Sequence, residues 1–260
     1  MNMRYGICSQ SMVSLRETPS HKSQMVNQLL FGDLFLIKDE INNWFFIETI
    51  DDNYKAWVDD NQVFILNETD FKANRDANKV YSLKESITTK AQDDQKTTIR
   101  YTFGSSLPNY EDSKFSICNN SFIHTGDVQI PGKGLNVIEI AKEYLESPYL
   151  WGGRSIFGID CSGFTQIVFK LAGILLARDS SQQIEMGSVL SFIEEAKEGD
   201  LAFFENEEGL IVHVGILIDN HTIIHASGKV RIDKIDHNGI YNQELQKYTH
   251  KLRLVKRIFE

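Results

Sequence analysis

The sequence predicts an α+β domain preceded by two small β-barrels. Three observations support this fold class: short β-like runs fill the first half of the chain, a helical pattern begins near residue 135, and further strand-like runs follow it. A chain of 260 residues is long enough for two or three such domains. We place the barrels at residues 1–66 and 80–130 and the α+β domain at 135–260.

Aromatic and β-branched runs separated by turn residues predict the first barrel. These runs are "MVSLRETPS", "QLLFGDLFLIKDE", "NWFFIETI", "YKAWVDD" and "QVFIL". The polar residues 67–79 are typical of a linker or a short helix. A second, degenerate barrel is predicted from "VYSLKES", "TTIRYTF" and "SFIHTGDV", although no exact internal repeat relates it to the first.

The last domain begins with two predicted helices. "NVIEIAKEYLES" has apolar residues at helical spacing and should end near Pro148. A second helical pattern begins just after Cys161 and continues through "FTQIVFKLAGILL". Four strand-like runs follow: "DLAFFE", "GLIVHVGILID", "HTIIHASG" and "YTHKLRLVKRIF". Helices followed by strands predict the α+β class.

Composition narrows the range of partners and the compartment. The net charge of −9 argues against nucleic acid or an anionic membrane as the main partner. Cys8, Cys118 and Cys161 are too far apart for a disulfide framework or a closely spaced metal motif. The N-terminal residues lack the pattern of a signal peptide, and no apolar run is long enough for a bilayer. We therefore expect a cytoplasmic protein with reduced thiols, unless a leader has been removed.

Cys161 is the first candidate for chemistry. The unpaired N–H groups and the dipole at the start of a helix favour an anion, so a thiolate should form more easily there. Three preceding glycines, Gly152, Gly153 and Gly158, would let the chain bend sharply and approach a ligand closely. The alternative is that Cys161 is a small buried hydrophobic residue without a chemical role.

Two histidines lie in consecutive predicted strands. If a three-residue loop follows Ile218, that residue pairs with Thr222 and Gly215 pairs with His225. His213 and His225 then become diagonal neighbours on one face, and Gly215 leaves room for the imidazole opposite it. A loop one residue shorter or longer would send the two histidines to opposite faces, so the arrangement is a prediction of register.

A cysteine at a helix start, a histidine and a polar orienting group are the parts of a thiol acyl-transfer site. His213 would take the proton from Cys161 and return one to the leaving amine, and His225 would hold the useful tautomer of His213. Taken singly, each histidine could equally be structural. A zinc site of Cys161 and the two histidines is the other alternative, but such ligands usually lie closer in sequence. We expect no metal and no other cofactor.

Five segments together resemble the NlpC-type cell-wall peptidases, which are papain-like cysteine peptidases. They are "PYLWGGRSIFGIDCSGF", "RDSSQQ", "KEGDLAFF", "VHVGILI" and "IIHASG", within residues 135–260. In the first barrel, "LR", "PS", "LLFGD" and "WV" resemble the bacterial SH3-like module, and the second barrel is interpreted as a degenerate copy. The combination resembles the γ-D-glutamyl-L-diamino acid endopeptidases that trim peptidoglycan stem peptides.

The resemblance implies a role for each matching residue. Cys161 is the nucleophile, His213 the general base and His225 the third polar member. Tyr149 matches a tyrosine whose hydroxyl lies near the oxyanion, a position that the Cys161 backbone N–H would share. An aromatic residue after a proline can also serve packing alone.

The resemblance also implies a site for the free amine of an N-terminal L-alanine. Asp160, Ser162 and Ser180 match the positions that recognise it, although Asp160 would serve equally as a helix cap. Tyr54 matches a wall residue of the first SH3-like module that narrows the groove. Glu17 is a weaker candidate for the ammonium, and a solvated turn is its plainer interpretation.

The resemblance implies a cysteine endopeptidase that cleaves the γ-D-glutamyl-L-diamino acid bond, in L-Ala-γ-D-Glu-diaminopimelate, and the missing signal peptide favours cytoplasmic recycling of murein peptides. One alternative is an exported lytic peptidase or amidase that the SH3-like modules tether to intact peptidoglycan. Another is a peptide-binding protein whose peptidase domain is silent, which the intact cysteine and histidines argue against.

Overall fold

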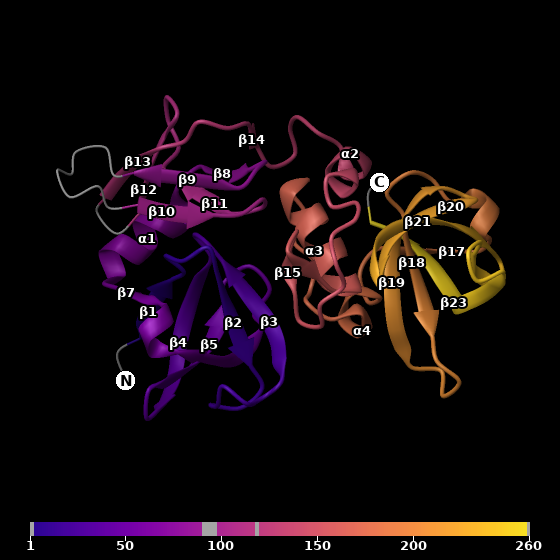
Figure 1. Cartoon of the computed structure of the whole chain (residues 1–260), viewed down its shortest axis with the longest axis horizontal. Coiled ribbons are helices and arrows are strands. Elements are labelled where there is room, and N and C mark those ends of the chain that lie inside the picture. The colour runs from indigo at the N-terminus through magenta and orange to yellow at the C-terminus, as the bar shows by residue number, and fades with distance from the viewer. Residues whose placement is uncertain (1–2, 90–97, 118–119, 259–260) are drawn as a thin grey trace. The chain divides into compact units, whose positions relative to one another are not determined.

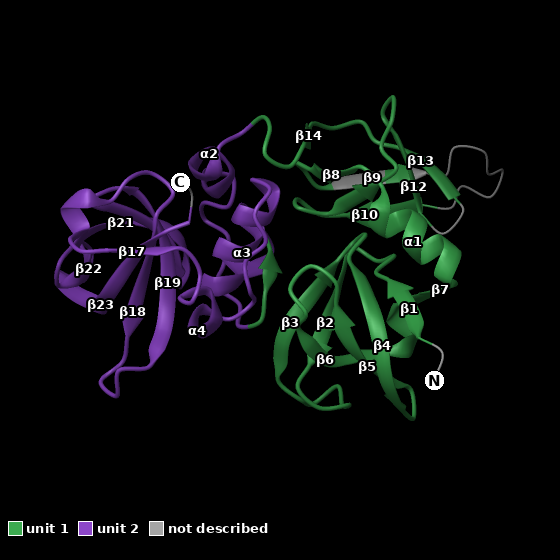
Figure 2. Ribbon diagram, turned by 180° about the vertical axis from the view of Figure 1, so that it is seen from behind, with its two compact units in different colours: residues 1–134, 152–155 green, residues 135–151, 156–260 purple. Residues whose placement is uncertain are grey.

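The computed structural model describes residues 3–89, 98–117 and 120–258, so Cys118 lies outside the described residues. The chain divides into two compact units, and each is described by itself. Unit 1 comprises residues 1–134 and 152–155, and unit 2 comprises residues 135–151 and 156–260 (Figure 2). Within the described ranges, no helix combines the length and apolarity needed to cross a bilayer.

The first part of unit 1 is a seven-stranded antiparallel sheet (Figure 1). Its strands are β1 (Arg4–Ile7), β2 (Met12–Arg16), β3 (Met25–Leu30), β4 (Leu34–Ile41), β5 (Trp44–Thr49), β6 (Lys55–Asp59) and β7 (Phe64–Leu66), in the order β3-β2-β6-β5-β4-β1-β7. The sheet encloses a core that includes Val13, Leu15, Phe35, Ile47 and Val58. Alternation of apolar residues along the strands provides this core, as the sequence predicts.

The predicted run over residues 28–40 is two strands, because a turn interrupts it. Gly32 has a φ of 83°, which favours glycine, and Asp33 Oδ2 accepts the Leu30 N–H at 3.0 Å. After a short 3₁₀ helix, η1 (Asp60–Gln62), and β7, the predicted linker forms helix α1 (Glu68–Asp76). Asn67 caps this helix by accepting the Asp70 N–H at 2.8 Å.

The second part of unit 1 consists of small sheets. Its strands are β8 (Lys79–Ser82), β9 (Ser86–Thr89), β10 (Thr98–Tyr101), β11 (Ser106–Pro108), β12 (Lys114–Ile117), β13 (Asn120–Ile123) and β14 (Val128–Gln129). They pair as β11-β8-β14, β10-β9 and β12-β13. One hydrophobic cluster joins Phe31 and Leu66 from the first part to Tyr101, Leu107 and Phe115 from the second. Unit 1 is therefore β-rich throughout, and the predicted second barrel stays a prediction.

Strand β15 (Arg154–Ser155) lies in the four-residue segment that belongs to unit 1. Gly152 has a φ of 77°, and a Cβ there would lie 2.7 Å from the Met25 carbonyl oxygen. Arg154 Nη1 lies 3.0 Å from Asp33 Oδ2, and the two side chains are only 5% and 7% exposed. Gly152 thus allows the chain to lie close to the backbone at Met25. From the sequence we expect a close approach to a ligand instead, so that expectation is wrong for Gly152.

Unit 2 has helices first and a sheet after them. The helices are α2 (Val137–Lys142), α3 (Cys161–Leu171), α4 (Ser180–Gln183) and the 3₁₀ helix η2 (Ile193–Glu195). The strands are β16 (Gly158–Ile159), β17 (Ser188–Leu190), β18 (Leu201–Glu205), β19 (Ile211–Asp219), β20 (Thr222–Ser227), β21 (Lys229–Asp236), β22 (Gly239–Asn242) and β23 (Lys247–Arg257). Four of these strands, β16, β17, β21 and β22, and the short helices α4 and η2 were not predicted from the sequence.

The main sheet of unit 2 closes on itself. Its order is β17-β23-β18-β19-β20-β21-β22, and an additional pairing joins β22 to β23. Helix α3 packs against β19 and β20 and also contacts α2. Both predicted helices end earlier than expected: α2 ends at Lys142 and α3 at Leu171, just before Gly173 with its φ of 94°.

The buried Arg154–Asp33 pair should contribute to the stability of unit 1. We expect Arg154→Met to lower the free energy of unfolding by about 3–5 kcal/mol, because it leaves Asp33 buried without its partner cation. The exposed pair Arg4–Glu40, at 2.6 Å and with side chains 43% and 45% exposed, provides the control. Arg4→Met should cost about 1 kcal/mol or less. Urea unfolding of the two variants compares these costs, and equal costs would contradict the assigned role of Arg154.

Candidate active site

Cys161 is the first residue of α3, as the sequence predicts. Asp160 is its N-cap, and Asp160 Oδ1 accepts the Gly163 N–H at 2.7 Å. The Cys161 thiol is free and buried. A backbone hydrogen bond joins the thiol to Val214, the neighbour of His213 in β19. The start of the helix therefore brings the sulfur to the strand that carries the first histidine.

The environment of Cys161 disfavours its thiolate. Burial raises its pKa to about 11, and the Asp160 carboxylate acts in the same direction. Backbone hydrogen bonds to the thiol lower this pKa, and so does the positive charge of the Arg178 guanidinium. Together they oppose the effect of burial only in part. The expectation that the helix start eases ionisation is therefore wrong for the resting thiol, because burial outweighs the helix terminus.

The two histidines meet on one face of the β19–β20 hairpin. Ile216 pairs with Ile224. In this register Gly215 lies opposite His225, as predicted. His213 Nε2 lies 2.9 Å from His225 Nδ1, and the two rings are nearly perpendicular. A Cβ at Gly215 would lie 2.8 Å from the Cβ of His225. The predicted face and the predicted need for glycine are both confirmed.

The end of the hairpin differs from the prediction. Asp219, not Ile218, pairs with Thr222, and the register shifts between Leu217 and Asp219. The loop has two residues, Asn220 and His221, and Asp219 Oδ1 accepts the His221 N–H at 2.7 Å. The extra residue in β19 compensates for the shorter loop, so the register at the histidines is unchanged.

Strand β21 supplies two residues that the sequence analysis missed. His225 Nε2 lies 3.0 Å from Asp233 Oδ2, and Arg231 donates from Nε to the same oxygen at 2.6 Å and from Nη2 to Oδ1 at 3.0 Å. Asp233 pairs with Ile223, so it shares the face of the histidines. The alternation of apolar and charged residues in "KVRIDKID" is the signal that would have indicated this strand.

Burial keeps the two histidines neutral, whereas hydrogen bonds keep the Asp233 carboxylate charged. Burial lowers the pKa of His213 well below 6.5, and the nearby charges of His225 and His250 act in the same direction. Burial also lowers the pKa of His225, against the opposing effect of Asp233. For Asp233 burial acts to raise the pKa, but hydrogen bonds from His225 and Arg231 outweigh it and lower the pKa.

His250 of β23 stacks on His213. The ring centroids are 4.1 Å apart with an interplanar angle of 27°. Burial, with the charge of His225, lowers the pKa of His250 to about 4. The His213 ring also contacts Phe204, at 5.6 Å between centroids, so neighbours on two strands restrict its rotation.

A buried ion pair between Arg178 and Asp160 lies at the start of α3. Arg178 Nη2 lies 2.6 Å from Asp160 Oδ2, while Arg178 Nη1 lies 3.0 Å from Asp160 Oδ1 and 2.9 Å from Ser162 Oγ. Two of the three predicted amine-binding residues, Asp160 and Ser162, are thus hydrogen-bonded to a guanidinium that was not predicted from the sequence. Ser180 begins α4, two residues after Arg178. The predicted contacts of Asp160, Ser162 and Ser180 with an amine stay predictions.

Tyr149 lies near the nucleophile. Burial raises the pKa of Tyr149 to about 12, and the charges of Cys161 and Asp160 add to this shift, which places the hydroxyl within electrostatic range of both groups. The Tyr149 N–H donates to the Gly228 carbonyl at 2.9 Å, at the end of β20. The unit therefore brings Tyr149, Cys161 and both histidines together, and the oxyanion role of Tyr149 stays a prediction.

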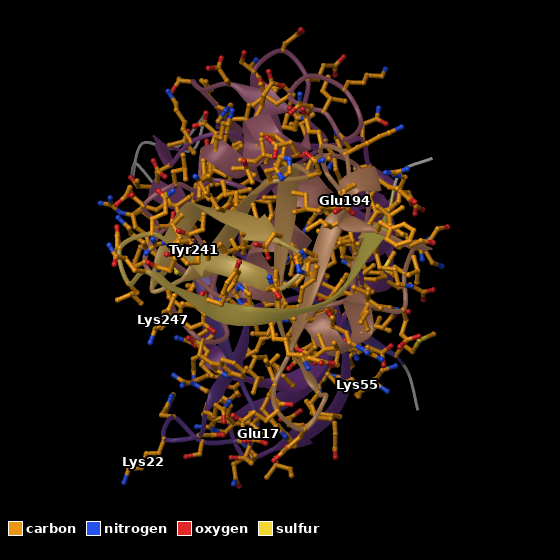
Figure 3. The ribbon with its side chains drawn as sticks, turned by 90° about the vertical axis from the view of Figure 1, so that its right-hand side faces the viewer. Glu17, Lys22, Lys55, Glu194, Tyr241 and Lys247 are labelled. Atoms are coloured by element: carbon orange, nitrogen blue, oxygen red, sulfur yellow. The ribbon has the colours of Figure 1, made fainter. Side chains whose placement is uncertain are left out.

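Tyr54 and Glu17 belong to unit 1. Tyr54 packs against the core of the first sheet, and its N–H donates to Thr49 Oγ1 at 2.9 Å. Glu17 is exposed (Figure 3), and its N–H donates to the Gln24 carbonyl at 3.1 Å. Their predicted contacts with a substrate stay predictions. No group of three or more His, Cys, Asp or Glu side chains in the described parts of the chain is placed to hold a metal ion.

Two family models match the chain. Residues 146–252 match the model described as NlpC/P60 family, and residues 15–63 match the one described as bacterial dipeptidyl-peptidase Sh3 domain. The crystal structure of an NlpC/P60 family protein from Bacillus cereus ATCC 10987 has a TM-score of 0.81 at 19% identity, covering 98% of this chain and 99% of that chain. At this identity, the similarity shows the fold.

Curated relatives match about two fifths of the chain. A gamma-D-glutamyl-L-lysine dipeptidyl-peptidase from Bacillus subtilis (strain 168) is 39% identical over 100 residues, which are 38% of this chain and 33% of that protein. The protein named "Probable endopeptidase p60" from Listeria grayi is 42% identical over 100 residues, 38% of this chain and 19% of that protein. The match thus spans about a third or less of the length of these relatives.

Alkylation should reveal the neutral resting thiol. Because only the thiolate reacts, we expect the rate of iodoacetamide labelling at Cys161 to rise about tenfold per pH unit from pH 6 to 9, with no plateau. Mass spectrometry of the peptide that contains Cys161 measures this rate separately from Cys8 and Cys118. Free cysteine in the same reaction is the control and should level off above about pH 8.5. A plateau for Cys161 near pH 7 would contradict the raised pKa.

His250 should make unit 2 less stable in acid. The unfolded chain takes up a proton on this residue below about pH 6.5, while the folded chain stays neutral there until about pH 4. Unfolding should therefore become easier as the pH falls through this window. We expect His250→Phe, which keeps a ring against His213, to reduce the loss of stability between pH 7.5 and 4.5 by about 1–2 kcal/mol.

Urea unfolding at the two pH values measures this difference. His221→Phe, at the exposed tip of the β19–β20 hairpin, is the matched control and should leave the difference unchanged. The same pH dependence in His250→Phe as in the wild type would show that His250 does not contribute.

Proposed function

We propose that the protein is a cysteine peptidase that hydrolyses the γ-D-glutamyl-L-diamino acid bond of peptidoglycan stem peptides, and that residues 146–252, which match the NlpC/P60 family, carry this activity. One observation carries this proposal. The Cys161 thiol lies beside β19, where His213 Nε2 is 2.9 Å from His225 Nδ1 and His225 Nε2 is 3.0 Å from Asp233 Oδ2. This is the order of groups that a thiol peptidase needs.

In the proposed mechanism, a neutral thiol and a neutral imidazole react together. His213 takes the Cys161 proton as the sulfur forms a bond to the carbonyl carbon of the γ-glutamyl amide. The tetrahedral oxyanion then collapses, the C–N bond breaks, and His213 gives the proton to the leaving amine of the diamino acid. Water, deprotonated by His213, next attacks the thioester, which releases the γ-glutamyl carboxylate and restores the thiol.

Two donors would serve the oxyanion. With a pKa of about 12, the Tyr149 hydroxyl keeps its proton at neutral pH and can donate it in a hydrogen bond. The Cys161 backbone N–H, in the first turn of α3, is the second. Donors fixed in a buried site stabilise developing charge more than water does.

We propose that the substrate is a released peptide with a free N-terminal L-alanine. Asp160, Ser162 and Ser180 would recognise its amine. The relatives named dipeptidyl-peptidase support this, since such enzymes remove two residues from a free N-terminus. The diamino acid is diaminopimelate or lysine, and those names favour lysine. Such a substrate suits cytoplasmic recycling of murein peptides, to which we assign the protein.

The similarity to the p60 endopeptidases favours a second candidate function. An exported enzyme would use the same cysteine on intact peptidoglycan, and its SH3-like modules would tether it to the wall. Both candidates use the same chemistry and differ in whether the alanine amine must be free.

Mass spectrometry of peptide cleavage should separate these functions. We expect release of the diamino acid from L-Ala-γ-D-Glu-diaminopimelate or its lysine counterpart, no release from the N-acetylated peptides, and no cleavage of intact sacculi. Cys161→Ala should lose at least about 10³-fold in rate, because it removes the nucleophile. Cys8→Ala, which removes the buried free thiol of unit 1, is the matched control and should stay active. Equal cleavage of free and acetylated peptides, with solubilised sacculi, would favour the lytic enzyme.

A further inference from the structure

The line of hydrogen bonds behind His213 continues past His225 to a carboxylate. His213 Nε2 is 2.9 Å from His225 Nδ1, and His225 Nε2 is 3.0 Å from Asp233 Oδ2. The three residues are 5%, 1% and 7% exposed, so water does not compete freely for these bonds. Each of these hydrogen bonds must therefore use a proton that belongs to His213, His225 or Asp233.

The carboxylate fixes the direction of both hydrogen bonds. An ionised carboxylate only accepts, so His225 carries its proton on Nε2. A neutral imidazole has a single proton, and His225 Nδ1 is consequently an acceptor. His213 must then donate to it from Nε2, which leaves the lone pair of His213 on Nδ1. Because Nε2 of His213 donates to His225, Nδ1 is the ring nitrogen left to act as a general base. It must be unprotonated to do so.

Arg231 holds the carboxylate in this role. Its Nε and Nη2 donate to Asp233 Oδ2 and Oδ1 at 2.6 and 3.0 Å, a two-bond fork that fixes the carboxylate plane. The register agrees, because Arg231 pairs with His225, and Asp233 pairs with Ile223 one pleat away on the same face. The ion pair also keeps Asp233 charged, and a charged carboxylate is what the line of hydrogen bonds requires.

We infer that Asp233 is a positioning residue that sets the tautomers of His225 and His213 and so prepares His213 Nδ1 to accept the Cys161 proton. The tautomers follow from the structure alone. The effect on rate rests on the proposed function. The competing explanation is that Asp233 and Arg231 form a structural ion pair and that His225 selects its tautomer without them.

The direct test is ¹⁵N NMR of histidine-labelled full-length protein at pH 7.5, which distinguishes protonated from unprotonated ring nitrogens. In the wild type, we expect His225 and His213 both to carry the proton on Nε2. Protonation of either residue on Nδ1 in the wild type would overturn the inference. This outcome does not depend on whether the proposed function is correct.

Asp233→Leu removes the acceptor. Asp233 Oδ2 accepts from both His225 Nε2 and Arg231 Nε, so an Asn could keep its oxygen there and preserve the pattern, whereas Leu cannot accept at all. A buried N–H without an acceptor is costly, so His225 should carry its proton on Nδ1 instead, and His213 should then carry its proton on Nδ1 as well. We expect both NMR patterns to switch and kcat on the cleaved peptide to fall about 10²- to 10⁴-fold, with KM changed less than about threefold.

Asp236→Leu is the matched control. Asp236 lies on the same strand, accepts a hydrogen bond from the Tyr248 hydroxyl at 2.5 Å and is distant from the histidine line in the pairing pattern. It should leave both tautomers and kcat unchanged. If Asp233→Leu folds but keeps the wild-type tautomers, Asp233 is structural only. If the wild type cleaves neither peptide while its tautomers are as expected, the proposed function fails and the positioning role of Asp233 stands.

Discussion

The register between β19 and β20 is the constraint on which the site depends. It places His213 and His225 on the same face, and the absence of a side chain at Gly215 allows the His225 side chain to lie across the neighbouring strand. Helix α3 packs against these two strands, and the thiol at its start is hydrogen-bonded to the backbone of Val214, next to His213. A shift of one residue between the strands would send His213 and His225 to opposite faces of the sheet. Folding of the hydrophobic core and assembly of the site are therefore the same event.

Within unit 2, the reacting groups are neutral and the charged groups near them are held in ion pairs. Burial raises the pKa of Cys161 and lowers that of His213, so both remain uncharged before a substrate arrives. The charges lie one step further out, in Arg178–Asp160 and Arg231–Asp233, where each carboxylate is held by a guanidinium. Uncharged groups are cheap to bury, whereas single charges are not. The charge needed for catalysis then develops only as the proton moves, beside dipoles that are already in place.

What the sequence predicted correctly is mostly local. The helix start at Cys161 and the hairpin register follow from patterns within a few residues, and the bulge before Asp219 did not disturb them. Arg178 and Asp233 were missed because their importance comes from partners on other elements, which no periodicity reveals. The ionisation of Cys161 was predicted from the helix terminus alone, while burial, a property of the folded unit, decides its sign. Tertiary contacts thus account for each of these failures.

The Arg178–Asp160 pair changes how an ammonium could be recognised. Donors from Gly163, Ser162 and Arg178 already approach the Asp160 oxygens, and the paired guanidinium cancels the carboxylate charge at a distance. An amine could not gain a full ion pair there without displacing one of these buried donors, which would be costly. Recognition of a free amine would therefore depend mainly on hydroxyl acceptors such as Ser162 and Ser180. Discrimination would come from the penalty of placing an acylated, uncharged nitrogen against them, not from a strong attraction for the positive charge.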